Sequence, residues 1–259
     1  VGSIKEDLKS EKRVSITPET AKNIINLGLK VFIENDYATH IGIADKDYEI
    51  VGVEIKNSPK EVIDNCNLLT KVNCPSDDEI KNLKDKTILI GMLNPSKNQN
   101  KINNIIKKNI DVFSLELLPR ISRAQSMDVL SSQSNLAGYR SVVDSIYEFE
   151  KAVPMMMTAA GTVPAAKVLV IGAGVAGLQA IATAKRLGAI VSATDVRAAS
   201  KEQVESLGGK FLTVDKSENL ETEGGYAKEV SEDFKKKQAE MMKDALKKND
   251  IVICTALIP

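Results

Sequence analysis

The stretch Val168-Leu-Val-Ile-Gly172-Ala-Gly174-Val-Ala-Gly177 joins a short apolar run to three glycines with the spacing G-x-G-x-x-G. A helical pattern follows over residues 178–187, and a second apolar run, residues 190–194, ends at Asp195. The order of strand, glycine-rich turn, helix, strand and acidic residue is typical of a dinucleotide-binding βαβ unit. We therefore predict an α/β fold with a parallel sheet around this stretch.

Each glycine of this stretch has its own physical role. Gly172 permits a tight turn, Gly174 lets a pyrophosphate approach the backbone, and Gly177 lets the helix pack closely on the strand. The helix adds free N–H groups and a positive dipole end. Asp195 can accept hydrogen bonds from the adenosine ribose and repels a 2′-phosphate, which favours NAD(H). Arg197 can receive a 2′-phosphate, so NADP(H) stays open as the alternative.

The composition excludes several classes of function. The chain has 259 residues, enough for two domains, and its 35 basic side chains balance 35 acidic ones. This balance gives no indication of a nucleic-acid partner. No apolar run approaches the roughly 20 residues that a membrane-spanning helix needs. The cysteines lack metal-ligand spacing and His40 is the single histidine, so we predict no metal site.

The N-terminal half alternates strand-like and helix-like segments. Thr17 and Ser58 each precede a proline and an apolar helical pattern, as residues that cap helices do. Such alternation predicts a parallel sheet covered by helices on both faces. We predict a first Rossmann-like lobe over residues 1–130 without a glycine fingerprint, with strands at 29–34, 67–72, 87–92 and 111–115.

A long connecting helix is expected over residues 131–153. Its apolar side chains recur every three or four positions and form one stripe, consisting of Leu136, Tyr139, Val143, Ile146 and Tyr147. The segment 154–164 follows, and we expect its three consecutive methionines, residues 155–157, to pack beneath the helix rather than to form a flexible hydrophobic contact.

The dinucleotide-binding lobe is then expected to cover residues 154–259. It contains four recognisable strands where about six are usual, which predicts that the lobe is incomplete at its C-terminus. Residues 215–228 have no clear periodicity and contain Gly224-Gly225-Tyr226. A stretch of this kind is either a functional lid or a plain surface loop.

The segment Arg120-Ile-Ser-Arg-Ala-Gln125-Ser-Met-Asp128 resembles the signature of the NAD(H)-binding first domain of proton-translocating NAD(P) transhydrogenases, the alpha subunit. Residues 154–164, 172–197, 224–228 and 255–259 resemble the same domain. The resemblance extends from the first strand to residue 259. In that family the chain continues further, so the resemblance implies a C-terminally truncated domain.

The resemblance implies a fold of two Rossmann-like lobes and a homodimer. It implies hydride transfer from NADH to NADP⁺, which a separate NADP(H)-binding domain holds, and a membrane-spanning domain that couples the transfer to proton movement. The chain would be a peripheral part of a membrane enzyme, on the cytoplasmic side in bacteria or at the inner membrane of a eukaryotic organelle. By resemblance, Arg120, Asp128 and Ser131 hold the dihydronicotinamide and its ribose, and Gln125 reaches toward the partner's NADP(H).

The resemblance also implies residues that bind NAD(H). Tyr226 matches a mobile loop that closes over the nucleotide. Direct transfer between two nicotinamide rings needs alignment and exclusion of water rather than an acid, a base or a metal. The implied NAD(H)-binding residues are Gly172, Gly174, Val175, Ala176, Gly177, Asp195, Val196, Arg197, Gly225, Tyr226, Thr255, Ala256 and Leu257.

Two other functions stay open. Alanine dehydrogenase is a relative with the same two-lobed fold, and Arg13 and Lys71 stand where its substrate-binding arginine and lysine would. The histidine that it needs for proton transfer is missing from residues 87–95. A non-catalytic NAD(H) sensor is the second alternative, and only turnover with a partner domain distinguishes a sensor from a transhydrogenase.

Overall fold

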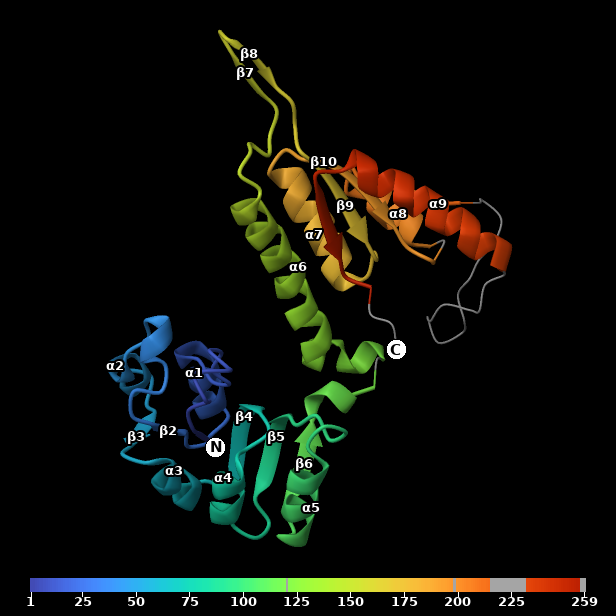
Figure 1. Cartoon of the computed structure of the whole chain (residues 1–259). Helices are drawn as coiled ribbons and strands as arrows, with labels where there is room; N and C mark the ends of the chain where they lie inside the picture. Colours follow the sequence, from blue (N-terminus) through green and yellow to red (C-terminus); the bar gives the residue numbers. More distant parts are fainter. Residues whose placement is uncertain (120, 198, 215–231, 257–259) are drawn as a thin grey trace. The chain divides into compact units, whose positions relative to one another are not determined.

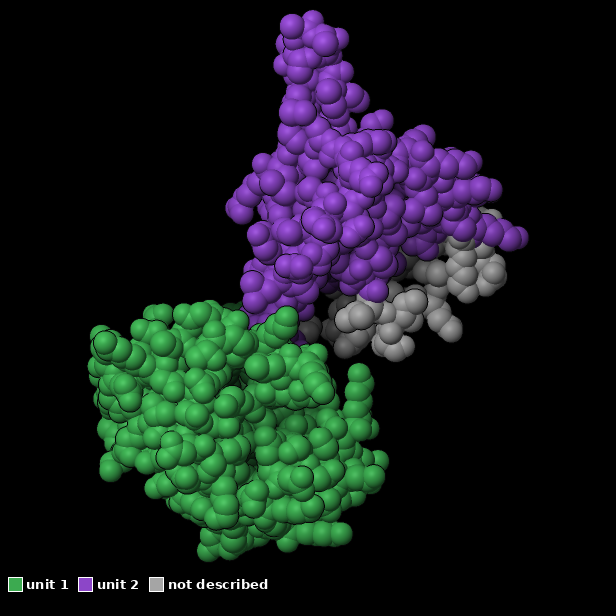
Figure 2. Space-filling model, turned by 60° about the vertical axis from the view of Figure 1, so that its left-hand side comes forward, with its two compact units in different colours: residues 1–129 green, residues 130–259 purple. Residues whose placement is uncertain are grey.

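The computed structural model describes residues 1–119, 121–197, 199–214 and 232–256. The chain divides into two compact units, residues 1–129 and residues 130–259, which Figure 2 shows in different colours. Each unit has its own parallel sheet and its own apolar core. The predicted α/β fold with two Rossmann-like parallel sheets is confirmed.

Unit 1 is built on a six-stranded parallel sheet with the order β3-β2-β1-β4-β5-β6. Its strands are β1 (Gly2–Ser3), β2 (Phe32–Glu34), β3 (Glu54–Lys56), β4 (Leu68–Asn73), β5 (Ile88–Met92) and β6 (Asp111–Ser114). Its helices are α1 (Pro18–Asn26), α2 (Asp45–Glu49), α3 (Pro59–Asn65), α4 (Asp77–Asn82) and α5 (Gln99–Lys107). The strand order reverses between β1 and β4, and side chains beyond their carboxyl ends can meet there.

Local sequence explains where the helices of unit 1 begin. The Thr17 hydroxyl accepts a hydrogen bond from the N–H of Thr20, and the Ser58 hydroxyl accepts one from the N–H of Glu61. In both helices a proline occupies the first position, where its missing N–H costs nothing. Both predicted helix starts are confirmed.

Unit 2 contains a four-stranded parallel sheet with the order β11-β10-β9-β12. The strands are β9 (Lys167–Ile171), β10 (Ile190–Thr194), β11 (Lys210–Phe211) and β12 (Ile251–Cys254). Helices α7 (Val175–Arg186) and α8 (Ser200–Ser206) follow β9 and β10, and α9 (Glu232–Lys248) precedes β12 (Figure 1). With right-handed crossovers, α7 and α8 cover one face of the sheet and α9 covers the other.

The long helix α6 (Val129–Glu148) packs on α7 through a different face from its most apolar one. Gly138 and Val142 are buried, and Ile146 and Phe149 join the same core cluster. A Cβ at position 138 would lie 2.1 Å from the Ala176 carbonyl oxygen, so only glycine allows the two helices to approach this closely.

The apolar stripe predicted on α6 is largely exposed instead. The exposed fractions are 59% for Leu136, 51% for Tyr139 and 83% for Tyr147. The helix therefore carries apolar side chains on two faces, and close approach at Gly138 selects which of the two packs on α7.

The methionine segment forms a β-hairpin that projects from unit 2, as Figure 1 shows. Its strands β7 (Met156–Thr158) and β8 (Gly161–Val163) are antiparallel and pair only with each other among the described strands. Met155 and Met157 are 61% and 78% exposed. The prediction that these methionines pack beneath the helix is wrong, because the hairpin directs them away from the core.

Candidate functional site

The glycine-rich turn between β9 and α7 permits no side chain at two of its three glycines. Gly172 has φ +94°, and a Cβ there would lie 2.9 Å from the backbone nitrogen of Ala256. A Cβ at Gly177 would lie 1.8 Å from the Gly172 carbonyl oxygen. The N–H of Gly172 donates to the Thr194 carbonyl at 2.8 Å, which ties the turn to β10. The turn and the start of α7 are therefore locked together.

Gly174 is different, because the space beside it is open. A Cβ there would have the Arg197 guanidinium, 4.0 Å away, as its nearest neighbour. Gly174 caps α7, which begins at Val175, so the first N–H groups of the helix have no carbonyl one turn earlier to bind. An open backbone beside a helix N-terminus fits an anionic group such as a pyrophosphate.

Asp195, at the end of β10, is oriented by groups on both sides of it. Its Oδ2 accepts hydrogen bonds from the N–H of Ala173 at 2.6 Å and from Nη2 of Arg197 at 3.0 Å. Its Oδ1 accepts from the backbone N–H and from Nε of Arg197, both at 2.9 Å. Burial raises the pKa of this carboxyl, but the hydrogen bonds and charge of Arg197 and the Ala173 N–H outweigh burial and hold the pKa below its usual value.

Thr255 supports the glycine-rich turn from the neighbouring strand β12. Its N–H donates to the Ile171 carbonyl at 2.8 Å, and its hydroxyl donates to the Gly172 carbonyl at 2.9 Å. The resemblance places Thr255 in the binding set, but nothing in the sequence indicates that its hydroxyl fixes the turn. This contact depends on β12 lying beside β9, which is a long-range pairing.

The structure gathers most of the predicted NAD(H)-binding residues at the carboxyl end of the unit 2 sheet. They are Gly172, Gly174, Val175, Ala176, Gly177, Asp195, Val196, Arg197, Thr255 and Ala256. Arg120, Gly225, Tyr226 and Leu257 lie outside the described residues, and so does the predicted lid over residues 215–228.

The predicted nicotinamide-side loop lies at the end of unit 1. Residues 122–127 form a short 3-10 helix in which Ala124 is buried and Gln125 is exposed. The N–H of Asp128 donates to the Gln125 carbonyl at 3.2 Å. Asp128 immediately precedes α6, and Ser131 lies in the first turn of that helix. A carboxylate at this position interacts favourably with the helix dipole.

Unit 1 has a second charged cluster, around Lys71 on β4. The Lys71 ammonium contacts both carboxylate oxygens of Glu79 at 2.9 and 3.1 Å, the Lys5 carbonyl at 3.2 Å and the Glu6 carboxylate at 3.7 Å. The Lys71 side chain is only 4% exposed. Internal carboxylates therefore neutralise the lysine that an alanine dehydrogenase would use for its substrate.

Arg13 is engaged in a similar way. Its Nε and Nη2 donate to the two carboxylate oxygens of Glu11 at 2.8 and 2.7 Å. Hydrogen bonding from Arg13 lowers the pKa of Glu11 to about 2. Both cations of the alanine dehydrogenase alternative are thus paired with glutamates, which does not favour an amino-acid substrate site here.

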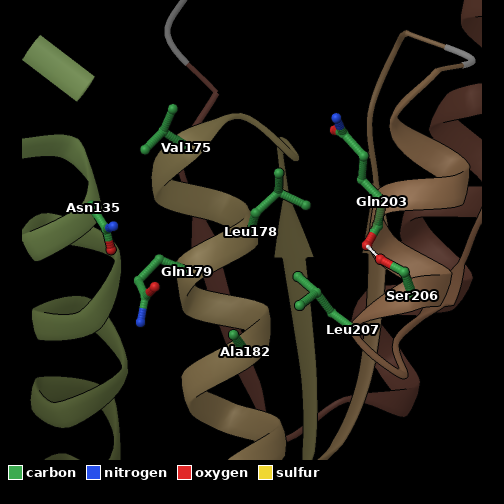
Figure 3. Close-up of a pocket in the computed structure, with 8 residues that line it drawn as sticks. All are labelled: Asn135, Val175, Leu178, Gln179, Ala182, Gln203, Ser206 and Leu207. Atoms are coloured by element: carbon green, nitrogen blue, oxygen red, sulfur yellow. Dashed lines mark hydrogen bonds between the residues drawn. The ribbon is translucent and has the colours of Figure 1, made fainter. Parts of the chain in front are cut away.

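A pocket of about 430 Å³ lies beside α7, between α6 and α8 (Figure 3). Asn135 lines it from α6, Leu178 and Gln179 line it from α7, and Leu207 lies at the end of α8. Val175 is the one predicted site residue in its lining. The pocket therefore borders the start of α7 but does not include the glycine-rich turn.

These features define a two-lobed α/β protein whose second lobe has the geometry of a dinucleotide-binding site. The model of the alanine dehydrogenase/PNT N-terminal domain matches residues 2–137, and that of the C-terminal domain matches residues 141–259. The chain therefore belongs to the alanine dehydrogenase/PNT family, and within it to the NAD(P) transhydrogenase alpha subunits, as the following similarities show.

The first of the polypeptides that make up the NAD(P) transhydrogenase alpha subunit of Rhodospirillum rubrum is 52% identical over 262 residues, which cover 98% of this chain and 68% of that protein. The protein of the same name from Rickettsia prowazekii is 48% identical over 262 residues, 99% of this chain and 68% of its own length. The crystal structure of transhydrogenase from Sinorhizobium meliloti is 43% identical, with a TM-score of 0.86, and the match covers 100% of this chain and 70% of that one. The resemblance to the transhydrogenase alpha subunit is confirmed.

Proposed function

We propose that the chain is the NAD(H)-binding component of a proton-translocating transhydrogenase and that it presents NADH for direct hydride transfer to NADP⁺ on a partner domain. The observation that carries this proposal is the open backbone at Gly174, between the N-terminus of α7 and the Asp195 carboxylate. The similarity to transhydrogenase alpha subunits supports it.

Each component of the candidate site has a role in this proposal. Gly174 and the first N–H groups of α7 hold the pyrophosphate, and Asp195 accepts hydrogen bonds from the adenosine ribose. Bound NADH supplies the hydride. Arg120, Asp128 and Ser131 orient the nicotinamide side, and Gln125 extends toward the partner's nucleotide. Alignment and exclusion of water are then the main contributions of the protein.

Binding and turnover with added partner test the proposal. NADH and NADPH are titrated separately, following nicotinamide fluorescence, which no tryptophan in this chain disturbs. Binding of NADH in preference to NADPH, followed by hydride transfer once an NADP(H)-binding domain is added, is the expected result. Binding without transfer would identify a sensor, and binding of neither nucleotide would contradict the proposal.

Asp195→Asn is expected to weaken NADH binding about tenfold and NADPH binding by less. The carboxylate makes charge-assisted hydrogen bonds worth about 1.5–3 kcal/mol, and its removal also releases Arg197 to receive a 2′-phosphate. Titration of both nucleotides against the variant measures the two effects. Asp144→Asn, on exposed α6, is the matched control and should change neither affinity. An equal loss for NADH and NADPH would refute the assignment of Asp195.

Gln125→Ala is expected to slow hydride transfer about tenfold, because small losses of alignment between reacting groups have large effects on rate. The affinity for NADH should stay nearly unchanged, since the glutamine is assigned to the partner's side. Stopped-flow transfer with the partner domain gives the rate, and fluorescence titration gives the affinity. Gln99→Ala, an exposed glutamine on α5, is the control. A fall in affinity proportional to the fall in rate would contradict this role.

We also infer that the chain assembles as a homodimer and works with a membrane-spanning domain of the same enzyme. The hairpin of β7 and β8 supports the dimer, because a two-stranded hairpin is marginally stable unless it packs against something else. Its exposed Met155 and Met157 give it an adaptable apolar surface. None of the helices within the described residues is long and apolar enough to cross a bilayer.

A further inference from the structure

The Asp195 carboxylate is already saturated with hydrogen-bond donors. Four donors contact it: the N–H of Ala173, the N–H of Arg197, and Nε and Nη2 of the Arg197 guanidinium. An ionised carboxylate offers about four lone-pair positions. A ribose hydroxyl can therefore reach Asp195 only if one of these donors leaves.

Of the four donors, the two on the guanidinium are the ones that can move away. The N–H of Ala173 belongs to the glycine-rich turn, which Gly172 and Gly177 lock in place. The N–H of Arg197 follows directly from the path of the chain after β10. The Arg197 side chain, by contrast, is 31% exposed, while the carboxylate that it covers is 6% exposed.

Building on the proposed function, we propose that Arg197 is a latch on the ribose subsite, which a ligand opens by offering the guanidinium a phosphate in place of the Asp195 carboxylate. The geometry supports this exchange. Nη2 of Arg197 is the atom nearest to a Cβ built on Gly174, at 4.0 Å, and Gly174 is where the pyrophosphate is expected. The arginine fork matches phosphate as well as carboxylate.

The latch makes a chemical distinction between ligands. A nucleotide with phosphates at Gly174 replaces the ion pair that it breaks, because the guanidinium keeps an anionic partner. A nucleoside without phosphate breaks the same ion pair and offers no replacement. Arg197 thus selects for phosphate-bearing adenine nucleotides at a site whose base and ribose contacts alone do not require phosphate.

The test compares adenosine, ADP and NADH binding to the full chain and to Arg197→Ala by isothermal titration calorimetry. In the variant, adenosine is expected to bind about threefold to tenfold more tightly, since a partly buried ion pair worth about 1 kcal/mol no longer competes. ADP is expected to bind more weakly by a similar factor, because its phosphate loses the guanidinium. The ratio of ADP affinity to adenosine affinity should therefore fall at least about tenfold.

This ratio separates a latch from a structural role. Damage to the lobe would weaken both ligands together and leave the ratio unchanged, which would overturn the latch. Weaker ADP binding with unchanged adenosine binding would also overturn it and leave Arg197 as a phosphate contact. Arg197→Lys keeps the charge without the fork and should lie between wild type and Arg197→Ala. Arg186→Ala, at the far end of α7, should match wild type.

Failure of the proposed function gives a different result. If the wild-type chain binds neither NADH nor ADP, the dinucleotide site itself is refuted, and the latch with it. If the wild-type chain binds NADH and Arg197→Ala shows no gain for adenosine, only the latch is refuted.

Discussion

Lys71→Met is expected to lower the free energy of unfolding of unit 1 by about 3–5 kcal/mol, as loss of one partner from a buried ion pair does. The Lys71 side chain is 4% exposed and lies between Glu6 and Glu79, with the Lys5 carbonyl as a further acceptor. Without the ammonium, two carboxylates face each other in a buried site. Urea denaturation, with hydrogen exchange of the β1 and β4 amides to locate the effect, measures the loss.

A surface lysine provides the matched control. Lys60 on α3 pairs with Asp64 at 2.7 Å, but its side chain is 68% exposed. Lys60→Met should therefore cost at most about 0.5 kcal/mol. Equal losses for Lys60→Met and Lys71→Met would show that the buried cluster contributes nothing beyond an ordinary surface pair.

The loss in Lys71→Met should also depend on pH. Burial raises the pKa of Glu6 even in the wild type, where the Lys71 charge partly opposes this rise. A carboxyl with a raised native pKa binds more protons in the native state than in the unfolded state, so stability falls as the pH rises through its native pKa. The variant lacks the opposing charge, so its deficit should shrink as the pH is lowered from about 7 toward about 5. A deficit that stays constant over this range would contradict the role of Glu6.

Gly177→Ala is expected to destabilise unit 2 by about 3 kcal/mol, at the upper end for overpacked sites, and to weaken NADH binding at least about 100-fold. The added Cβ would lie 1.8 Å from the Gly172 carbonyl oxygen, which is backbone and cannot turn aside. Helix α7 would have to move away from the glycine-rich turn, taking its N-terminal N–H groups with it. Thermal unfolding and NADH titration measure the two effects.

Gly174→Ala separates binding from folding in the same turn. Gly174 has φ −75°, which alanine adopts readily, and the added Cβ meets nothing closer than 4.0 Å. Thermal stability should therefore match wild type, while NADH affinity falls about tenfold because the methyl group occupies the approach of the pyrophosphate. A destabilised Gly174→Ala, or an undisturbed Gly177→Ala, would contradict the assigned roles of these two glycines.

The sequence predicts what depends on neighbouring residues. The βαβ unit around Gly172, Gly174 and Gly177 is recognisable because backbone sterics and helix geometry act over a few residues. The starts of α1 and α3 are recognisable for the same reason, since the capping hydroxyls of Thr17 and Ser58 act within one turn. Helices α2 and α4, with 5 and 6 residues, are too short to show a period.

The sequence does not predict which of two apolar faces of α6 is buried. Leu136, Tyr139 and Tyr147 are large and apolar, yet the packed face carries Gly138 and Val142. Periodicity reports that a helix has apolar stripes, but the choice between them depends on how closely α7 can approach. In the hairpin, Met156 pairs with Val163 on the opposite strand, so its neighbours are not those that a continuous chain would suggest.

The sequence by itself determined the α/β class, the dinucleotide-binding unit and the identity of Asp195 as its acidic residue, because each follows from short-range order along the chain. Only the tertiary structure decided that Arg197 saturates Asp195, that the Thr255 hydroxyl holds the glycine-rich turn, and that Glu6 and Glu79 neutralise Lys71. The physical reason is the same in each case. Hydrogen bonds and ion pairs depend on distances of about 3 Å between side chains, and the fold sets those distances.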